Sequence, residues 1–172
     1  MLVQIIGFIG FFLLGISNIR KNRKDIIIFQ ILSSIFFSVH YFLLNAITAS
    51  ILNIIGIFRG LTFYNKNRSN KLNYLYLFLY IITYIIIGAI TYESIFSIFP
   101  VIAYILFSVA IFNDSEVKIK FINIFVSTTW LIYDYIYHSY AGIISDIAMI
   151  ITIIVGLLIL RKNKASKISS KN

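Results

Sequence analysis

The chain has 172 residues, of which 60% are hydrophobic and only 12% are charged. Because a soluble domain carries roughly 25% charged residues, this composition excludes an ordinary soluble protein and indicates an integral membrane protein. The net charge of +9 could suggest a nucleic-acid partner. In a membrane protein, however, the first question is where the basic residues lie relative to the membrane spans.

Residue types that hold metals or form disulfides are scarce. Cysteine is absent and the two histidines lie far apart, which excludes thiolate sites and argues against a dedicated zinc site. No nucleophile elbow, phosphate-binding loop or zinc motif occurs in the sequence. We therefore expect no metal, no cofactor, no nucleic-acid partner and no enzymatic activity.

Seven apolar segments follow one another along the chain. Crossing the hydrocarbon layer of a bilayer takes about 20 apolar residues in a helix. The segments run roughly over residues 2–19, 26–45, 47–64, 72–91, 94–112, 119–138 and 141–160. This pattern predicts an all-α, polytopic protein with seven transmembrane helices and the lipid bilayer as a partner. The first segment is not expected to be a signal peptide, because its basic residues follow the apolar run.

The basic residues occur in alternate loops. Fourteen of the fifteen Lys and Arg residues follow the first, third, fifth and seventh segments or lie at the edges of those loops. Since positive loops stay cytoplasmic, the N-terminus is expected outside and the C-terminus inside the cell. A six-span count would put the first basic loop and the basic tail on opposite sides. The tail, 161–172, is expected to be a disordered cytoplasmic segment.

An internal repeat is visible at an offset of 93 positions. There the second and third segments overlay the sixth and seventh without a gap. The polar and aromatic pairs are Gln30 with Asn123, Ser34 with Ser127, Phe37 with Trp130, Tyr41 with Asp134, and Asn53 with Asp146. We interpret them as two parallel three-helix repeats, 1–65 and 94–160, joined by a linking helix at 72–91 (3+1+3). Parallel repeats are a transporter design with the site between the halves.

The paired residues also obey helix geometry. In the second segment they follow i, i+4, i+7 and i+11 spacing, which places them on one face of a helix, and the sixth segment repeats this stripe. The two stripes are therefore expected to line one central cavity.

Asp134 and Asp146 are acids inside predicted spans. Because burying a charge in a membrane is costly, a functional role is the first hypothesis for such residues. If the two carboxyl groups face each other they could share a proton, which suits a proton- or cation-coupled process. For Asp134, which stands near the outer end of its span among tyrosines, the alternative is simple hydration at the outer interface.

Three further residues are candidates for contact with a solute. Trp130 offers a flat face for stacking, with ordinary packing as the alternative. Asn53 can donate and accept hydrogen bonds, with an interhelical bond as the alternative. Arg59 is the one basic residue placed inside a span; it could bind an anionic group or an acid, with snorkelling to the cytoplasmic surface as the alternative.

The first third of the chain resembles a known family. The segment 5–64 reads IIGFIGFFLLGISNIRKNRKDIIIFQILSSIFFSVHYFLLNAITASILNIIGIFRGLTFY. It is similar to the start of bacterial inner-membrane proteins of the YgjV family, and the 3+1+3 layout resembles the SWEET/PQ-loop superfamily of small-solute transporters. The resemblance implies the bacterial inner membrane and a central pocket with a Trp on the sixth span and Asn on the third and seventh. Trp130 and Asn53 match, whereas Asp146 replaces an amide by an acid.

The chain also departs from that superfamily. Its single proline, Pro100, stands in the fifth span, where SWEET transporters carry one proline on each of four spans. No Pro-Gln dipeptide occurs, so the resemblance does not carry sugar specificity or the same gating to this chain.

Taken together, the sequence predicts a transporter of a small polar solute. Asn53, Trp130 and Asp146 would hold the solute, Asp134 and Tyr41 would line the outer vestibule, and Arg59 would lie on the inner side. The alternative is a non-transporting membrane receptor, or a structural or partner-binding protein, on the same fold. The sequence leaves open whether the chain forms a homo-oligomer.

Overall fold

The computed structural model describes residues 1–20, 23–64, 71–111 and 116–169. Within these ranges the chain is all-helical and contains no strand, which confirms the predicted all-α class. The elements are α1 (Leu2–Ile19), α2 (Arg23–Leu43), α3 (Ile47–Tyr64), α4 (Lys71–Ile90), the short 3-10 helix η1 (Ile95–Ser97), α5 (Ile98–Ile111), α6 (Glu116–Ile136) and α7 (Tyr140–Ser169).

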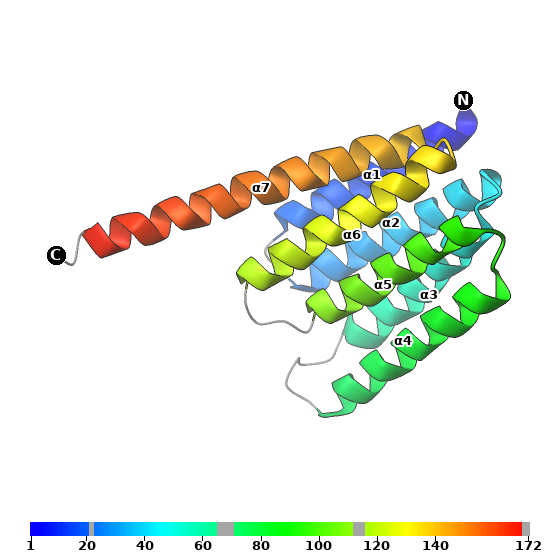
Figure 1. The fold of residues 1–172 in the computed structure, drawn as a ribbon, viewed down its shortest axis with the longest axis horizontal. Coiled ribbons are helices and arrows are strands. Elements are labelled where there is room, and N and C mark those ends of the chain that lie inside the picture. The colour runs from blue at the N-terminus through cyan, green and yellow to red at the C-terminus, as the bar shows by residue number, and fades with distance from the viewer. Residues whose placement is uncertain (21–22, 65–70, 112–115, 170–172) are drawn as a thin grey trace.

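The helices alternate in direction along one bundle (Figure 1). In each set of three helices the middle one packs between its neighbours: α2 lies between α1 and α3, and α6 lies between α5 and α7. The sets meet where α1 contacts α7 and where α3 contacts α5, and α4 rests against α3 and α5. We call the end with the short α2–α3 and α6–α7 turns the hairpin end, and the opposite end the basic end.

The two turns at the hairpin end have the same backbone form. Asn45 and His138 are the non-glycine residues with positive φ, at 58° and 53°, within the described ranges. A left-handed residue just past a helix lets the chain reverse while the last carbonyls keep their donors. Thus the amide of Ala46 donates to the carbonyl of Tyr41 and the amide of Ser139 to that of Asp134, both at 2.9 Å.

Helix α7 differs from the prediction. The sequence predicted a disordered tail from residue 161, but α7 continues without a break as far as Ser169. Residues 161–169 contain no proline or glycine, and extending a helix that already exists adds one hydrogen bond per residue without a new nucleation cost. The remaining predicted tail residues, 170–172, lie outside the described residues.

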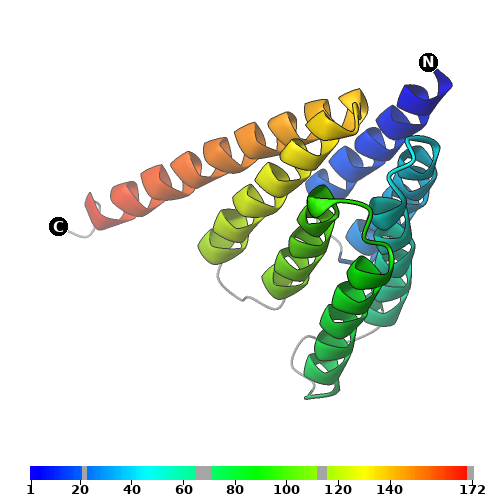
Figure 2. The same cartoon turned by 45° about the vertical axis from the view of Figure 1, so that its right-hand side comes forward.

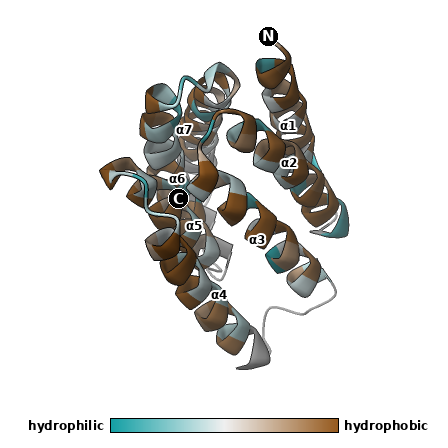
Figure 3. Ribbon diagram, turned by 90° about the vertical axis from the view of Figure 1, so that its right-hand side faces the viewer, coloured by the Kyte–Doolittle hydropathy of each residue, from teal (hydrophilic) through white to brown (hydrophobic). Residues whose placement is uncertain are grey.

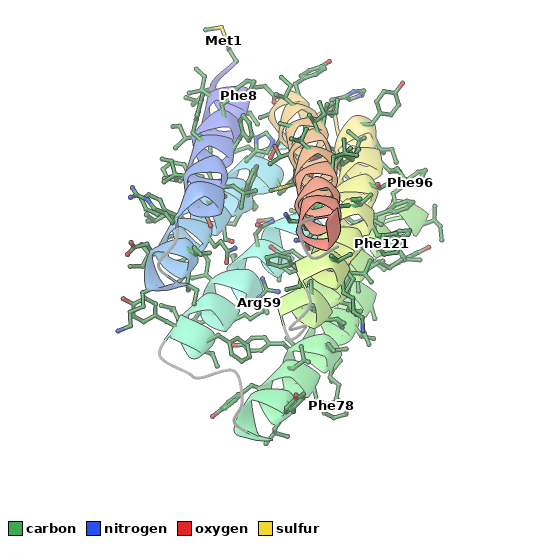
Figure 4. All side chains as sticks on the ribbon, turned by 90° about the vertical axis from the view of Figure 1, so that its left-hand side faces the viewer. Met1, Phe8, Arg59, Phe78, Phe96 and Phe121 are labelled. Carbon is green, nitrogen blue, oxygen red and sulfur yellow. The ribbon has the colours of Figure 1, made fainter. Side chains whose placement is uncertain are left out.

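The outer surface of the bundle is apolar. Apolar colour covers most of each helix (Figure 3), and large side chains such as Phe78 and Phe121 are 59% exposed and project outward (Figure 4). A soluble protein rarely exposes so continuous an apolar surface, whereas a lipid-facing one does so along its whole circumference.

By length and composition, three helical segments of the described chain could cross a membrane: Lys24–Leu43, Ile47–Tyr64 and Tyr140–Leu158. The apolar segments Leu2–Ser17, Tyr74–Ile90 and Ile95–Ala110 are shorter, and α6, which carries Lys118, Lys120 and Asp134, falls in neither group. The seven helices are therefore observed, and the count of seven spans stays a prediction.

Small residues allow the helices to approach closely. A Cβ built on Gly7 of α1 would lie 2.7 Å from Cβ of Ala141 in α7 and 2.8 Å from Cε1 of His40 in α2. Gly15 of the same helix has no such neighbour within 4 Å. Close approach through small residues is a main source of helix association in membranes, where lipid competes with apolar side chains.

We therefore expect Gly7→Ala and Gly15→Ala to shift thermal stability in opposite directions. Gly7→Ala forces α1 away from α2 and α7 and should destabilise the fold by about 1–3 kcal/mol. Gly15→Ala has open space and better helix propensity, which should stabilise it by up to roughly 1 kcal/mol. Melting curves of the detergent-purified variants measure both, and equal shifts for the two variants would contradict this packing.

Candidate functional site

One cavity of about 650 Å³ lies inside the bundle. All ten paired residues line it, the eight of the two stripes together with Asn53 and Asp146, and α4 contributes no lining residue among those the structure describes. The six candidates from the sequence thus face one space: Tyr41, Asn53, Arg59, Trp130, Asp134 and Asp146. Their shared location is observed, and their roles stay predictions.

The cavity is closed at the hairpin end by a buried hydrogen bond between α2 and α6. The hydroxyl of Tyr41 donates to Oδ1 of Asp134 at 2.7 Å, and the two residues are only 3% and 1% exposed. The Asp134 carboxyl group occupies the place where a side chain on Gly142 would stand, so only glycine fits there. Both side chains line the cavity and are buried by their contact with each other, and their predicted role in an outer vestibule stays a prediction.

A second link beside this seal was not anticipated from the sequence. His40, fully buried, places Nδ1 2.8 Å from the carbonyl of Val3 and Nε2 2.8 Å from the hydroxyl of Ser139. It joins α1 and α2 to the α6–α7 turn. The available signal was a polar residue within the second apolar segment, directly before Tyr41.

The N-terminal helix adds to the same seal. The side chain of Gln4 donates to the carbonyl of His138 at 3.0 Å and accepts from the amide of Ala141 at 3.2 Å. From this closed end the helices fan apart toward the basic end (Figure 2). The cavity follows them, and its lining there includes half-buried residues of α1, α2 and α7: Leu14, Ile26 and Met149.

Asp146 has an unsatisfied acceptor inside the protein. The oxygen Oδ2 is buried and has no hydrogen-bond donor among the described residues, and the same is true of Oδ1 of Asn123. The carboxyl group of Asp146 is close enough to that of Asp134 to interact with it directly. Two carboxyl groups form a hydrogen bond with each other only when one of them holds a proton.

Trp130 belongs to an aromatic wall of the cavity. Its ring stacks on Tyr41 with centroids 5.4 Å apart and planes 20° apart, and it meets Tyr104 and Tyr133 edge-on at 5.9 Å. Tyr41 therefore covers one face of the indole. The part of the ring that lines the cavity remains the surface on which a solute could stack.

Asn53 is 5% exposed and lines the same cavity. Nδ2 donates to the carbonyl of Ala49 at 2.9 Å, one turn earlier in α3. One of the two amide hydrogens is thus used within α3, and among the described residues this amide makes no hydrogen bond to another helix.

Arg59 is buried, at 7% exposed, and does not snorkel to the surface (Figure 4). Nη1 donates to the hydroxyl of Ser108 at 2.8 Å, and the guanidinium carbon lies 4.6 Å from the ring centroid of Phe107 and 5.6 Å from that of Tyr104. No acidic side chain pairs with it in the part of the chain that the structure describes. A buried cation held only by neutral groups is the least compensated charge in the cavity.

Comparison with protein families identifies the class. A family model described as bacterial inner membrane protein, Imp-YgjV, matches residues 1–164. The chain belongs to the Imp-YgjV family. This confirms the resemblance and places the protein in the bacterial inner membrane with the bilayer as a partner. Neither the curated proteins nor the solved structures contain a match.

Because the Imp-YgjV family is an inner-membrane family, the apolar outer surface of the bundle is expected to face lipid. In a bilayer, water cannot reach the lipid-facing surface, so ionisable side chains point toward protein or toward a wet cavity. Asp134, Asp146 and Arg59 all do so. Two acids and one arginine of this Imp-YgjV protein therefore face the same internal cavity.

We expect Tyr41→Phe to weaken the seal of this Imp-YgjV protein. It removes the donor to a buried carboxyl oxygen, which should lower the free energy of unfolding by about 1–3 kcal/mol. The matched control is Tyr135→Phe, because Tyr135 is 75% exposed and lies next to Asp134 in the chain. Thermal denaturation in detergent measures both; equal stability of the two variants would mean that the hydrogen bond contributes nothing.

Proposed function

We propose that this Imp-YgjV protein transports a small polar solute across the inner membrane through the central cavity. The observation that carries the proposal is that all ten residues paired at the offset of 93 line one space, with acids, amides, hydroxyls and an indole together. A volume of about 650 Å³ lies in the range of sites that hold small molecules.

The proposal includes two parallel three-helix repeats, 1–65 and 94–160, with 72–91 as the linking span. The helix bounds support it: α2 and α6 begin at Arg23 and Glu116 and end at Leu43 and Ile136, each pair separated by the offset of 93 that also separates Tyr41 from Asp134. The left-handed turn residues, Asn45 and His138, stand at the same offset. An exchange of inward-facing and outward-facing states by rocking of two halves is the mechanism that such repeats favour.

We propose that the hairpin end faces outward and the basic end faces the cytoplasm, following the distribution of Lys and Arg. In this orientation the Tyr41–Asp134 and His40–Ser139 links close the outer side, while the helices spread on the inner side (Figure 2). The arrangement suits an inward-facing state. Outward opening would require these two hydrogen bonds to break.

Within the cavity we assign roles from position and chemistry. Asp146, Asn53 and Trp130 hold the solute, and Asp134 with Tyr41 forms the outer gate. Arg59 lies nearer the basic end, six residues after Asn53 in α3. A proton shared by Asp134 and Asp146 would be released when a cationic group of the solute or another cation approaches. Binding of the cation would then be coupled to release of the proton. No step of this scheme makes or breaks a covalent bond in the solute, so we propose no enzymatic activity.

We expect flux to depend on the cavity residues. Proteoliposomes containing the protein are tested with labelled sugars, nucleosides, amino acids and vitamin-like cations. Asp146→Asn and Trp130→Ala, alone and together, should reduce uptake of the transported class at least about tenfold, the loss expected when 1.4 kcal/mol of binding is removed. Glu93→Gln is the control, because Glu93 is exposed and lies outside the cavity.

Two outcomes would overturn transport. Uptake that persists unchanged in the double variant would separate flux from this cavity. Binding by the same protein without any flux would instead favour a receptor on this fold.

The proposed orientation is testable by fusion. A fluorescent protein that matures only in the cytoplasm should be bright when attached after the last residue and dark when inserted beside Glu93. Alkaline phosphatase, which is active only outside the cytoplasm, should give the reverse. The opposite pair of results would invert the topology.

A further inference from the structure

We infer that the solute is a small zwitterion, with its anionic group bound by Arg59 and its cationic group bound by Asp134 and Asp146. The inference rests on the proposed transport function and names the substrate class of that same cavity. It follows from three features of the cavity: the guanidinium of Arg59 without an acidic partner among the described residues, an unsatisfied carboxyl oxygen of Asp146, and an aromatic wall between the two.

The anionic subsite is built around Arg59. Ser108 donates its own hydrogen to the carbonyl of Tyr104 at 2.7 Å, so its oxygen is available to accept from Nη1 of Arg59. That hydroxyl orients the guanidinium but leaves its charge without a counter-charge. The rings of Phe107 and Tyr104 hold the group in place from the side. A carboxylate or phosphate is the partner that a guanidinium fork binds with two parallel hydrogen bonds.

The cationic subsite is built around the two acids. Oδ2 of Asp146 is buried and lacks a donor among the described residues, and Asp134 stands beside it with one oxygen engaged by Tyr41. An ammonium group supplies three donors and a positive charge, which satisfies the orphan oxygen and removes the repulsion between the two carboxyl groups.

Single-charge solutes fit this cavity less well. An anion alone would face the two acids without a counter-charge, and a cation alone would leave Arg59 uncompensated. A neutral sugar would leave both Arg59 and the two acids without a counter-charge. A zwitterion brings an anionic group to Arg59 and a cationic group to the acid pair, and unpaired buried charges are what a selective site uses to reject the wrong ligand.

The two subsites are separated along α3. Arg59 follows Asn53 by six residues, which is about 9 Å of rise at 1.5 Å per residue. Asn53 is the counterpart of Asp146 in the proposed repeat, so the charged ends of the solute should stand farther apart than in an α-amino acid. A ladder of ω-amino acids therefore measures the separation.

The experiment is a thermal-shift titration of the full-length protein in detergent with glycine, β-alanine, γ-aminobutyrate and ε-aminocaproate. Butylamine and butyrate serve as the matched probes that each lack one charge. We expect one of the longer zwitterions to stabilise the protein and to bind at least about tenfold more tightly than either single-charge probe. Ligand that binds only the folded state raises apparent stability by mass action.

The variants assign each charge to its subsite. Arg59→Gln should abolish the preference for the zwitterion over butylamine, and Asp146→Asn should abolish its preference over butyrate. Arg59→Lys keeps the charge and should retain part of the preference, which separates loss of recognition from misfolding. Arg20→Gln is the control at the basic end, because Arg20 is exposed, stacks on Phe29 at 5.1 Å and lies outside the cavity.

A lipid headgroup is a second source of the same chemistry. Phosphoethanolamine and nanodiscs containing phosphatidylethanolamine form a separate arm, with phosphatidylglycerol as the anionic comparison. Stabilisation by the ethanolamine lipid that Arg59→Gln abolishes, without an effect of soluble ω-amino acids, would identify the zwitterion as a lipid headgroup.

The outcomes separate this inference from the proposed function. Equal binding of zwitterions and single-charge probes, or a preference that survives Arg59→Gln, overturns the zwitterion and leaves transport intact. Uptake of a neutral solute that depends on the cavity residues would likewise overturn the zwitterion and leave transport intact. Absence of binding and flux for every class tested overturns both.

Discussion

The hydrogen bond from Tyr41 to Asp134 is the contact on which the arrangement of the cavity depends. It is short and buried, and it joins two helices whose residues are 93 positions apart in the chain. Removing either partner would leave a polar group unsatisfied where water is scarce, so the bond holds α2 against α6 more firmly than its own net energy suggests. The space for the carboxyl group exists because position 142 is a glycine.

The rest of the hairpin end is organised around the same contact. His40 and Gln4 tie the first two helices to the α6–α7 turn, and Gly7 lets α1 come close enough for these bonds to form. In a bilayer, lipid competes with apolar side chains, so such polar links and small-residue contacts carry much of the specificity of packing. The result is a bundle joined at one end and spread at the other (Figure 2), and the cavity lies inside it.

The cavity itself is not arranged for maximal stability. An acid oxygen and an amide oxygen lack donors among the described residues, and Arg59 lacks an acid. Each would be less costly as an apolar residue of similar volume, because burying charge without a partner is among the most expensive events in folding. Their presence together in one space is the reason for proposing a ligand that satisfies them in turn, and the stacked and edge-on rings of Tyr41, Trp130 and Tyr104 form one wall of that space.

The sequence by itself determined the membrane class, the seven helical segments and the polar face of the second and sixth segments. These follow from composition and from the 3.6-residue period, which are local properties and need no knowledge of the partner helix. The family came from the likeness of residues 5–64 to YgjV proteins, which the family model confirms. Only the tertiary structure decided what each inward-facing group touches. The pairing of His40 with Ser139, the burial of Arg59 against Ser108 and the sealing of Tyr41 against Asp134 depend on the depth and rotation of helices far apart in the chain. Periodicity predicts which face of a helix is buried. Which residue of another helix contacts that face depends on tertiary packing, which no single segment encodes.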